Sequence, residues 1–389
     1  MFKINRTEES KLTSWYFEID RKLLVMVLIM ILVAMIMAIS SGSAMFVRTM
    51  NMTNKIPHWY EFFVRMIPFY VIGVLTMIGV SMTDKKTVIR LAWADLIVFF
   101  ILLIGTILFP HVVNNSKRWL MLPGLPRIMP SDLMKPGFVI VTAWFISKMR
   151  AVYDGDMFNL KRTLFQIKTW SWVWYLVPLV IILAIQISHP DFGTMVLYLG
   201  TLGVMLVLAG LPGKWITSMI GMGCGLFALG FAILPHVRAR TLAMFGAVDP
   251  HSQIGFALRA IRNGGLFGAG DKAYVVENLP MAESDFVLSV ICENFGAIAS
   301  CALIILLFVV FWRLLHQSKC ARDDFVSNAI AGAAAMFGIQ VCINLASTLR
   351  IMPAKGMTLP FISHGGSSFV AYCLLFGMVL ALMREDKWK

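Results

Sequence analysis

Three polar residues, Asp285, Ser289 and Glu293, recur at intervals of four within a long apolar stretch of the chain. On a helix they form one polar stripe, in which Glu293 lies about 12 Å along the axis from Asp285. Ionisable side chains are costly inside a membrane, so both carboxylates are candidates for function, for example as a general base. Two plainer interpretations stay open: Asp285 caps the helix that follows it, and Glu293 is a structural partner of another buried group such as Arg65.

Two opposite charges, Asp132 and Lys135, lie three residues apart at the start of another apolar segment. That spacing places them one turn apart on a helix, as a surface ion pair or as a functional pair at the membrane's outer edge. Asp191 lies in a tight turn between two further apolar segments. The seven histidines lack zinc-ligand spacing and the six cysteines form no Cys-x-x-Cys pair, so the sequence predicts no metal site. The glycine cluster at 264–270 follows no strand and predicts only a bent loop.

Membrane helices must position these residues, because 59% of the 389 residues are apolar and only 14% are charged. This composition excludes a soluble enzyme, and the long apolar runs lack the alternation of a β-barrel. The sequence therefore predicts an all-α polytopic membrane protein with about ten transmembrane helices. The candidate spans are residues 23–46, 62–82, 91–109, 133–146, 172–187, 194–211, 215–234, 286–315, 326–345 and 367–383.

Basic residues outnumber acidic ones, 34 against 21, but they are scattered between the apolar segments. They indicate membrane topology and contacts with anionic lipids rather than a nucleic-acid partner. Lysines and arginines concentrate in the short connections at 85–90 and 148–168, which predicts that these are cytoplasmic. With an even number of spans, both termini are then cytoplasmic.

This topology divides the chain into a cytoplasmic segment at 1–22, a single transmembrane domain at 23–384 and a cytoplasmic tail at 385–389. One long connection, residues 235–283 between the seventh and eighth helices, is expected outside the cytoplasm. It contains an amphipathic stretch at 254–261, so we expect it to be partly helical and to lie on the outer face of the membrane.

Six motifs, in order along nearly the whole chain, resemble those of the SEDS family. The segment 355–368, KGMTLPFISHGGSS, resembles the family's terminal signature, in a form closer to the division members than to the elongation members. The others are 20–24 (DRKLL), Arg118-Trp119 with 130–135 (PSDLMK), 190–194 (PDFGT), 263–270 (NGGLFGAG), and 279–286 with Glu293 and Gly296. The chain departs from the family pattern at Met129, Asp132, His189, Met281, Glu283 and His364.

The resemblance implies a peptidoglycan glycosyltransferase of the bacterial inner membrane that polymerises lipid II at its outer face, for septal wall synthesis. Asp285 matches the family's catalytic aspartate. The groups implied to bind the substrate and its pyrophosphate are Lys135, Asp132, Arg118, Arg259, Arg262, Lys355 and Ser367, while Glu293, Arg65 and Asp191 are structural polar groups in the membrane. A divalent cation, magnesium or manganese, could also neutralise the pyrophosphate.

The implied partners are lipid II, a class B penicillin-binding protein, other divisome proteins and membrane lipids. Three alternatives remain at this point. Ten spans with intramembrane charges are also typical of a lipid II flippase or other transporter. An elongation-type polymerase and a non-catalytic scaffold for division proteins are the others.

Overall fold

The computed structural model describes most of the chain, and the statements below concern those residues only. They are residues 11–40, 61–108, 111–113, 116–121, 127–152, 170–189, 191–233, 238, 241–242, 244–353 and 356–386.

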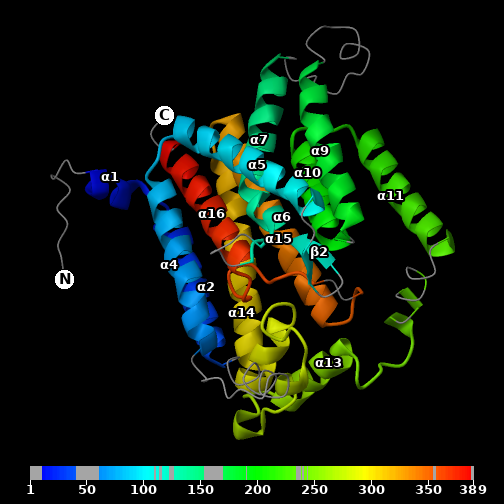
Figure 1. Ribbon diagram of the computed structural model, residues 1–389. Coiled ribbons are helices and arrows are strands. Elements are labelled where there is room, and N and C mark those ends of the chain that lie inside the picture. The colour runs from blue at the N-terminus through cyan, green and yellow to red at the C-terminus, as the bar shows by residue number, and fades with distance from the viewer. Residues whose placement is uncertain are drawn as a thin grey trace.

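Each of the ten candidate spans overlaps a helix of the structure, although residues 41–46 of the first span, residue 109 of the third and residue 234 of the seventh lie outside the described residues (Figure 1). These helices are α2 (Arg21–Ser40), α4 (Glu61–Ser81), α5 (Lys85–Leu108), α7 (Lys135–Val152), α9 (Trp170–Ser188), α10 (Phe192–Leu208), α11 (Gly213–Ile233), α14 (Val287–Cys320), α15 (Asp324–Thr348) and α16 (Gly366–Asp386). Six of them, α2, α4, α5, α14, α15 and α16, are long and apolar enough to cross a membrane, and shorter apolar stretches lie in α9 and α10. The all-α membrane fold is confirmed, while the number of crossings stays a prediction.

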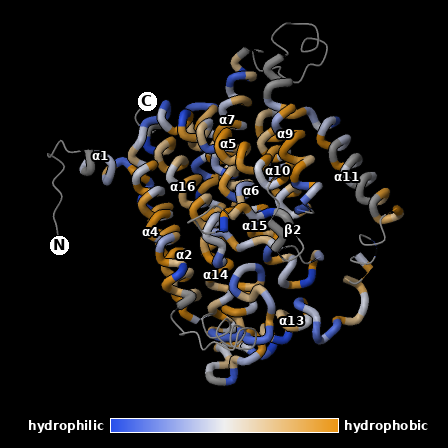
Figure 2. Tube along the Cα trace, in the orientation of Figure 1, coloured by the Kyte–Doolittle hydropathy of each residue, from blue (hydrophilic) through white to orange (hydrophobic). Residues whose placement is uncertain are grey.

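Two helices, α15 and α16, form the centre of the bundle. In their most apolar windows 72% and 83% of the residues are buried, against 22% in α4 and in α5. Outward-facing residues of the peripheral helices are large and apolar, such as Leu75 and Ile101, which suits contact with lipid. Figure 2 shows the result as a hydrophobic band between two more hydrophilic ends.

Close packing of α4 against α16 depends on a small residue. A Cβ atom on Gly377 of α16 would lie 2.8 Å from the carbonyl oxygen of Met77 in α4. Membrane helices have little hydrophobic driving force toward one another, so glycine at such a crossing gains the van der Waals contact that holds the pair together.

The two described ends of the chain lie at the same end of the bundle (Figure 1). The short helix α1 (Lys11–Glu18) is joined there to α16 by an ion pair of 3.6 Å between Glu18 and Arg384. It is joined to α4 by a hydrogen bond of 2.9 Å from the indole of Trp15 to Ser81. This arrangement agrees with an even number of crossings.

A β-hairpin, which we did not expect, precedes α7. Strand β1 (His111–Val113) pairs antiparallel with β2 (Ser116–Trp119), and Val113 is opposite Ser116. The sequence between the strands is Asn114-Asn115, which lies outside the described residues; asparagine is a residue type that hairpin connections favour. The Asn-Asn pair is a short signal for a hairpin, and the long apolar segments on both sides led us to interpret this region only as a connection.

The long connection between α11 and α14 is partly helical, as expected. It contains α13 (Gln253–Gly264) and the 3₁₀ turns η2 (Gly270–Lys272) and η3 (Val276–Asn278). Its glycine cluster does more than bend the chain, because it docks against α14 where that helix is broken. Gly296 has a φ of 85°, and a Cβ there would lie 2.2 Å from the carbonyl oxygen of Leu266. Hydrogen bonds cross this break from Ala269 N to Glu293 O (2.7 Å) and from Ala297 N to Gly265 O (2.9 Å).

The carboxylate of Glu293 is fully buried and holds the same connection. It accepts hydrogen bonds from Asn263 Nδ2 (2.7 Å) and from the backbone N–H groups of Val275 (3.0 Å) and Val276 (2.7 Å). The expectation of a structural role is therefore supported, but the expected partner was wrong. None of these bonds comes from Arg65, whose side chain is exposed on α4.

Candidate active site

Residues that are far apart in the sequence line one cavity of about 300 Å³ beside the start of α14. Five of the predicted site residues are among them, namely Asp285, Lys135, Asp132, Arg118 and Ser367. The walls come from β2, the short helix α6 (Pro130–Leu133), the start of α7, the turn before α14, the middle of α15 and the segment that leads into α16. The further lining residues are Trp119, Arg127, Met129, Thr194, Met281, Glu283, Ser284, Gln340, Gly356, Met357, Thr358, His364, Gly365, Gly366 and Ser368.

Asp285 lies in the turn before α14 and is held there through its backbone. Its carbonyl oxygen accepts a hydrogen bond of 3.0 Å from Asn344 Nδ2, which also donates to the carbonyl of Met357 (2.7 Å). The cap residue of α14 is Phe286, with no side-chain capping bond, so the structure does not support the capping interpretation of Asp285. Gly356 faces the carboxylate, and a Cβ there would lie 3.1 Å from Oδ2.

Burial raises the pKa of Asp285 to about 6, and the neighbouring charge of Glu283 acts in the same direction. The hydroxyl of Ser284 and the charge of Arg118 oppose this rise. A carboxylate with such a pKa is mostly ionised at pH 7 and is a far better proton acceptor than an ordinary aspartate.

Lys135 is almost completely buried, with 2% of its side chain exposed. Its ammonium lies 2.6 Å from Asp132 Oδ1 and donates to Gln340 Oε1 at 2.8 Å. It also lies 5.6 Å from the ring centre of Tyr372, whose hydroxyl donates to the same Gln340 oxygen. The predicted pair exists, and its burial excludes the surface ion-pair interpretation.

Gln340 connects this cation to the signature segment. Its Nε2 donates to the carbonyl (2.8 Å) and the hydroxyl (3.2 Å) of Thr358, and Thr358 donates in turn to Ser368 (2.9 Å). We did not foresee Gln340 or Tyr372, because each is a single polar residue inside an apolar helix and their pairing appears only when α15 and α16 are adjacent.

The start of α7 is fixed by two further contacts. Asp95 of α5 is buried and accepts the backbone N–H of Gly137 at 2.8 Å. It thus satisfies a first-turn donor that has no partner within its own helix. The hydroxyl of Tyr198 donates to the carbonyl of Ser131 at 2.8 Å. Lys135 therefore projects from a fixed helix end.

Arg118, on β2, reaches the cavity and pairs with Asp191 at 3.2 Å. Asp191 is the N-cap of α10 and accepts from Thr194 N, which agrees with the structural role expected of it. Arg127 also lines the cavity and was not predicted, since nothing in its surroundings marked it.

The segment before α16 closes the cavity. Ser367 Oγ accepts the backbone N–H of Met129 at 3.2 Å, and His364 bonds the carbonyl of Glu283 through its backbone N–H (3.0 Å) and its ring Nδ1 (2.9 Å). Two departures from the family pattern, Glu283 and His364, are therefore in contact. Burial lowers the pKa of His364, so the ring is neutral at pH 7 and donates from Nδ1.

Three predicted binding residues are not part of this cavity as described. Arg259 of α13 donates to the carbonyl of Pro250 (2.6 Å) and lies over the ring of Phe256. Arg262 is exposed on the same helix, and Lys355 falls outside the described residues.

No three histidine, cysteine, aspartate or glutamate side chains meet as a metal site within the described ranges. The acidic residues that line the cavity are Asp132, Glu283 and Asp285, and Asp132 is paired with Lys135, so a divalent cation there would need further oxygens from the substrate or from water.

Comparison with known proteins identifies relatives over almost the whole chain. The family model for the FtsW, RodA and SpoVE cell cycle proteins matches residues 21–388. A probable peptidoglycan glycosyltransferase FtsW of Caulobacter vibrioides is 30% identical over 383 residues, which is 98% of this chain and 93% of the relative. The probable peptidoglycan glycosyltransferase FtsW of Thiomicrospira cyclica is 27% identical over 387 residues, 96% of this chain and 95% of the relative.

Two solved structures share the fold. A chain from a peptidoglycan synthase complex superposes with a TM-score of 0.72 at 21% identity, covering 95% of this chain and 99% of that one. The rod shape determining protein RodA of Thermus thermophilus superposes with a TM-score of 0.65 at 21% identity, covering 95% and 98%.

Proposed function

The chain belongs to the FtsW, RodA and SpoVE family of cell cycle proteins, and we propose that it is a peptidoglycan glycosyltransferase that polymerises lipid II. Curated relatives that carry the glycosyltransferase name align over nearly its full length. Because these relatives are named FtsW, we assign the enzyme to septal wall synthesis during division rather than to elongation.

One observation carries the proposal: a single cavity unites a carboxylate of raised pKa with buried and half-buried cations. In glycan polymerisation the 4-hydroxyl of an acceptor sugar attacks the anomeric carbon of the donor. A carbon–oxygen bond forms there as the bond to undecaprenyl pyrophosphate breaks. The reaction needs a base for the hydroxyl proton and positive charge for the leaving group.

Asp285 takes the proton in this proposal, and Gly356 leaves its carboxylate open to the incoming sugar. Lys135 and Arg118 stabilise the negative charge that develops on the pyrophosphate, since such preorganised charges are most effective where water is excluded. Asp132 and Gln340 orient the ammonium of Lys135. Ser367 positions the segment before α7, and Arg259, Arg262 and Lys355 contact the parts of the substrate outside the cavity.

The protein is a multi-pass membrane protein, and we propose the following orientation for it. Both termini face the cytoplasm, and the connection at 235–283 and the Asp285 cavity lie at the outer face of the bacterial inner membrane, at the division septum. The Lys and Arg bias of the short connections supports this orientation.

A class B penicillin-binding protein is the partner we propose, as the transpeptidase that cross-links the new strand within the divisome. Support comes from the chain of similar fold in a peptidoglycan synthase complex that coordinates polymerization and crosslinking. Purification from native membranes in a mild detergent should recover such a transpeptidase with this chain, and its consistent absence would refute the partnership.

The decisive test of the activity is purified protein with labelled lipid II in detergent, followed by sizing of the products on a gel. A glycosyltransferase makes glycan polymer there. A flippase makes none, because moving lipid II across a membrane forms no glycosidic bond, so a polymer-free reaction with folded protein would contradict the glycosyltransferase proposal.

A further inference from the structure

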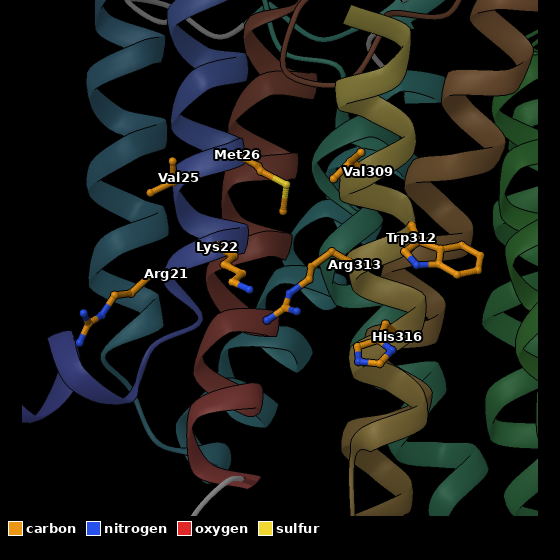
Figure 3. A pocket seen from close by; sticks show the side chains of 8 residues that line it. All are labelled: Arg21, Lys22, Val25, Met26, Val309, Trp312, Arg313 and His316. Atoms are coloured by element: carbon orange, nitrogen blue, oxygen red, sulfur yellow. The ribbon is translucent and has the colours of Figure 1, made fainter. Parts of the chain in front are cut away.

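A second cavity, of about 660 Å³, lies between the start of α2 and the last third of α14. Arg21, Lys22, Arg313 and His316 line one end of it, and Val25, Met26, Val309 and Trp312 line the rest. Figure 3 shows Lys22 and Arg313 extending from their two helices toward the same gap, with Met26 and Val309 about one turn further along. The proposed glycosyltransferase function uses none of these residues.

This cavity is far from Asp285. From Val287 at the start of α14 to His316 the helix advances roughly 40 Å at 1.5 Å per residue, more than the hydrocarbon core of a membrane. The second cavity therefore opens at the opposite face of the membrane. That face also carries α1 and the end of α16, which we assign to the cytoplasm.

Positive charge exceeds negative charge at this end of the cavity. The buried carboxylate of Asp20 is the acidic group there, and its oxygens are occupied by Leu23 N (3.1 Å), Arg313 Nη2 (2.7 Å) and Gln317 Nε2 (3.0 Å). Among the basic side chains that line the cavity, Arg313 bonds this carboxylate, which also caps α2 and holds α14.

Lys22, Arg313 and Arg21 have N–H groups that donate no hydrogen bond within the described part of the chain. Lys22 is exposed and has no hydrogen-bond or ion-pair partner in the described part of the chain. The Nε–H of Arg313 is buried without a partner, although its Nη2 bonds Asp20. Arg21 donates Nε to the carbonyl of Tyr16 and lies over that ring, which leaves its Nη groups for another acceptor.

The remaining lining is apolar and lies deeper along the helices. Along α2 the lining residues span about 7 Å from Arg21 to Met26, and along α14 about 10 Å from Val309 to His316. Trp312, 61% exposed, lies between the apolar and charged parts, where indole rings prefer the membrane interface. A ligand that matches this lining carries negative charge at one end and an acyl chain at the other.

We propose that this cavity binds one anionic phospholipid of the cytoplasmic leaflet, with its phosphate between Lys22 and Arg313. Its acyl chain lies along Val25, Met26 and Val309. The bound lipid would join α2 to α14, the helix that begins beside Asp285 at the other face. Basic residues near an anionic leaflet favour such binding by attraction to the headgroup.

Native mass spectrometry of the full-length protein tests this proposal. The protein is titrated with phosphatidylglycerol, with phosphatidylcholine of the same acyl chains, and with soluble glycerol 3-phosphate. We expect one phosphatidylglycerol to bind more tightly than phosphatidylcholine, and glycerol 3-phosphate not to bind. Equal binding of the two phospholipids, or binding of glycerol 3-phosphate without acyl chains, would overturn the proposal.

Lys22→Gln should weaken the phosphatidylglycerol affinity roughly fivefold, the contribution of one basic residue near an anionic lipid surface. Lys319→Gln is the matched control, because Lys319 is exposed at the same end of α14 but does not line the cavity. Neither substitution removes a described contact, so thermal unfolding without added lipid should be unchanged in both. An equal loss of phosphatidylglycerol affinity in the two variants would show that the lipid is attracted by general positive charge, and it would refute a defined binding site.

Discussion

Replacement of Asp285 by asparagine should abolish polymerisation and at the same time stabilise the protein. The two effects share one cause, the burial that raises the pKa of this carboxyl from 3.8 to about 6. Asparagine keeps the shape of the side chain but has no charge to desolvate and cannot accept the proton of a sugar hydroxyl.

The size of the stability effect follows from the pKa shift. At 1.36 kcal/mol per pKa unit, the ionised carboxylate destabilises the folded state by up to about 3 kcal/mol. The folded pKa lies above the unfolded one, so this penalty is absent below pH 3.8 and is complete above pH 6. Asp285→Asn should therefore raise the unfolding temperature at pH 8, and the gain should shrink to about half in free energy at pH 5.

The catalytic effect has its own pH dependence. A base with a pKa of about 6 is about one tenth ionised at pH 5 and about nine tenths ionised at pH 7. The kcat/KM of the wild-type enzyme for lipid II should be about tenfold lower at pH 5 than at pH 7. Loss of a general base lowers the rate by about 10² to 10⁴-fold, so the asparagine variant should make no detectable polymer.

The assays are thermal unfolding in detergent at pH 5 and pH 8, and product sizing from labelled lipid II. Glu277→Gln is the matched control, because it removes one negative charge from the same connection without touching the cavity lining. Normal polymerisation by Asp285→Asn would refute the assignment of the base. A variant that is less stable than wild type at pH 8 would refute the desolvation argument and would point to a structural bond of the carboxylate.

Three other predictions follow from the same geometry. Lys135→Ala should lose most activity, and Lys135→Arg should keep part of it. The double variant Asp132→Asn with Lys135→Met should fold and be inactive, because it leaves no unpaired buried charge. Wild-type rates in Lys135→Ala would refute the role of the cation. Gly296→Ala should lower the unfolding temperature strongly, because its φ of 85° and the nearby Leu266 carbonyl leave no room for a Cβ, and unchanged melting would contradict the break seen in α14. In intact cells, a single cysteine at position 250 should react with an impermeant thiol reagent and one at position 160 should not, in a background without native cysteines; the reverse pattern would overturn the topology.

The apolar segments predicted the helices because a chain inside a membrane must satisfy its backbone hydrogen bonds internally, and a helix does this within one segment. Helix ends were harder to place, and α14 illustrates why. Its apolar run was expected to stop near residue 315, but the helix continues to Cys320, where Ser318 exchanges hydrogen bonds with Ser327 of α15. Such endings depend on a neighbouring helix and cannot be read from local hydropathy.

The sequence indicated candidate site residues where it marked them by charge in an apolar setting or by a motif. Asp285 and Lys135 were selected in this way, and both line the same cavity. Gln340 carries no charge and belongs to no motif, so its role appears only from its bonds to Lys135 and Thr358. Charge also misled the prediction: Arg65 was expected to pair with Glu293, yet the Glu293 carboxylate is fully used by the 263–276 segment.

The buried Glu293 explains how the connection between α11 and α14 can hold the proposed base, Asp285, in place. It ties Asn263, Val275 and Val276 to α14, and the glycine cluster packs into the break at Gly296, three residues further along. Only a short run of chain then separates the fixed Val276 from Asp285, whose carbonyl is held by Asn344 of α15. A general base must be placed within about 0.5 Å to act, and loops alone seldom achieve this. Here both ends of the approach to Asp285 are bonded to membrane helices, so the turn that carries it has the rigidity of the bundle.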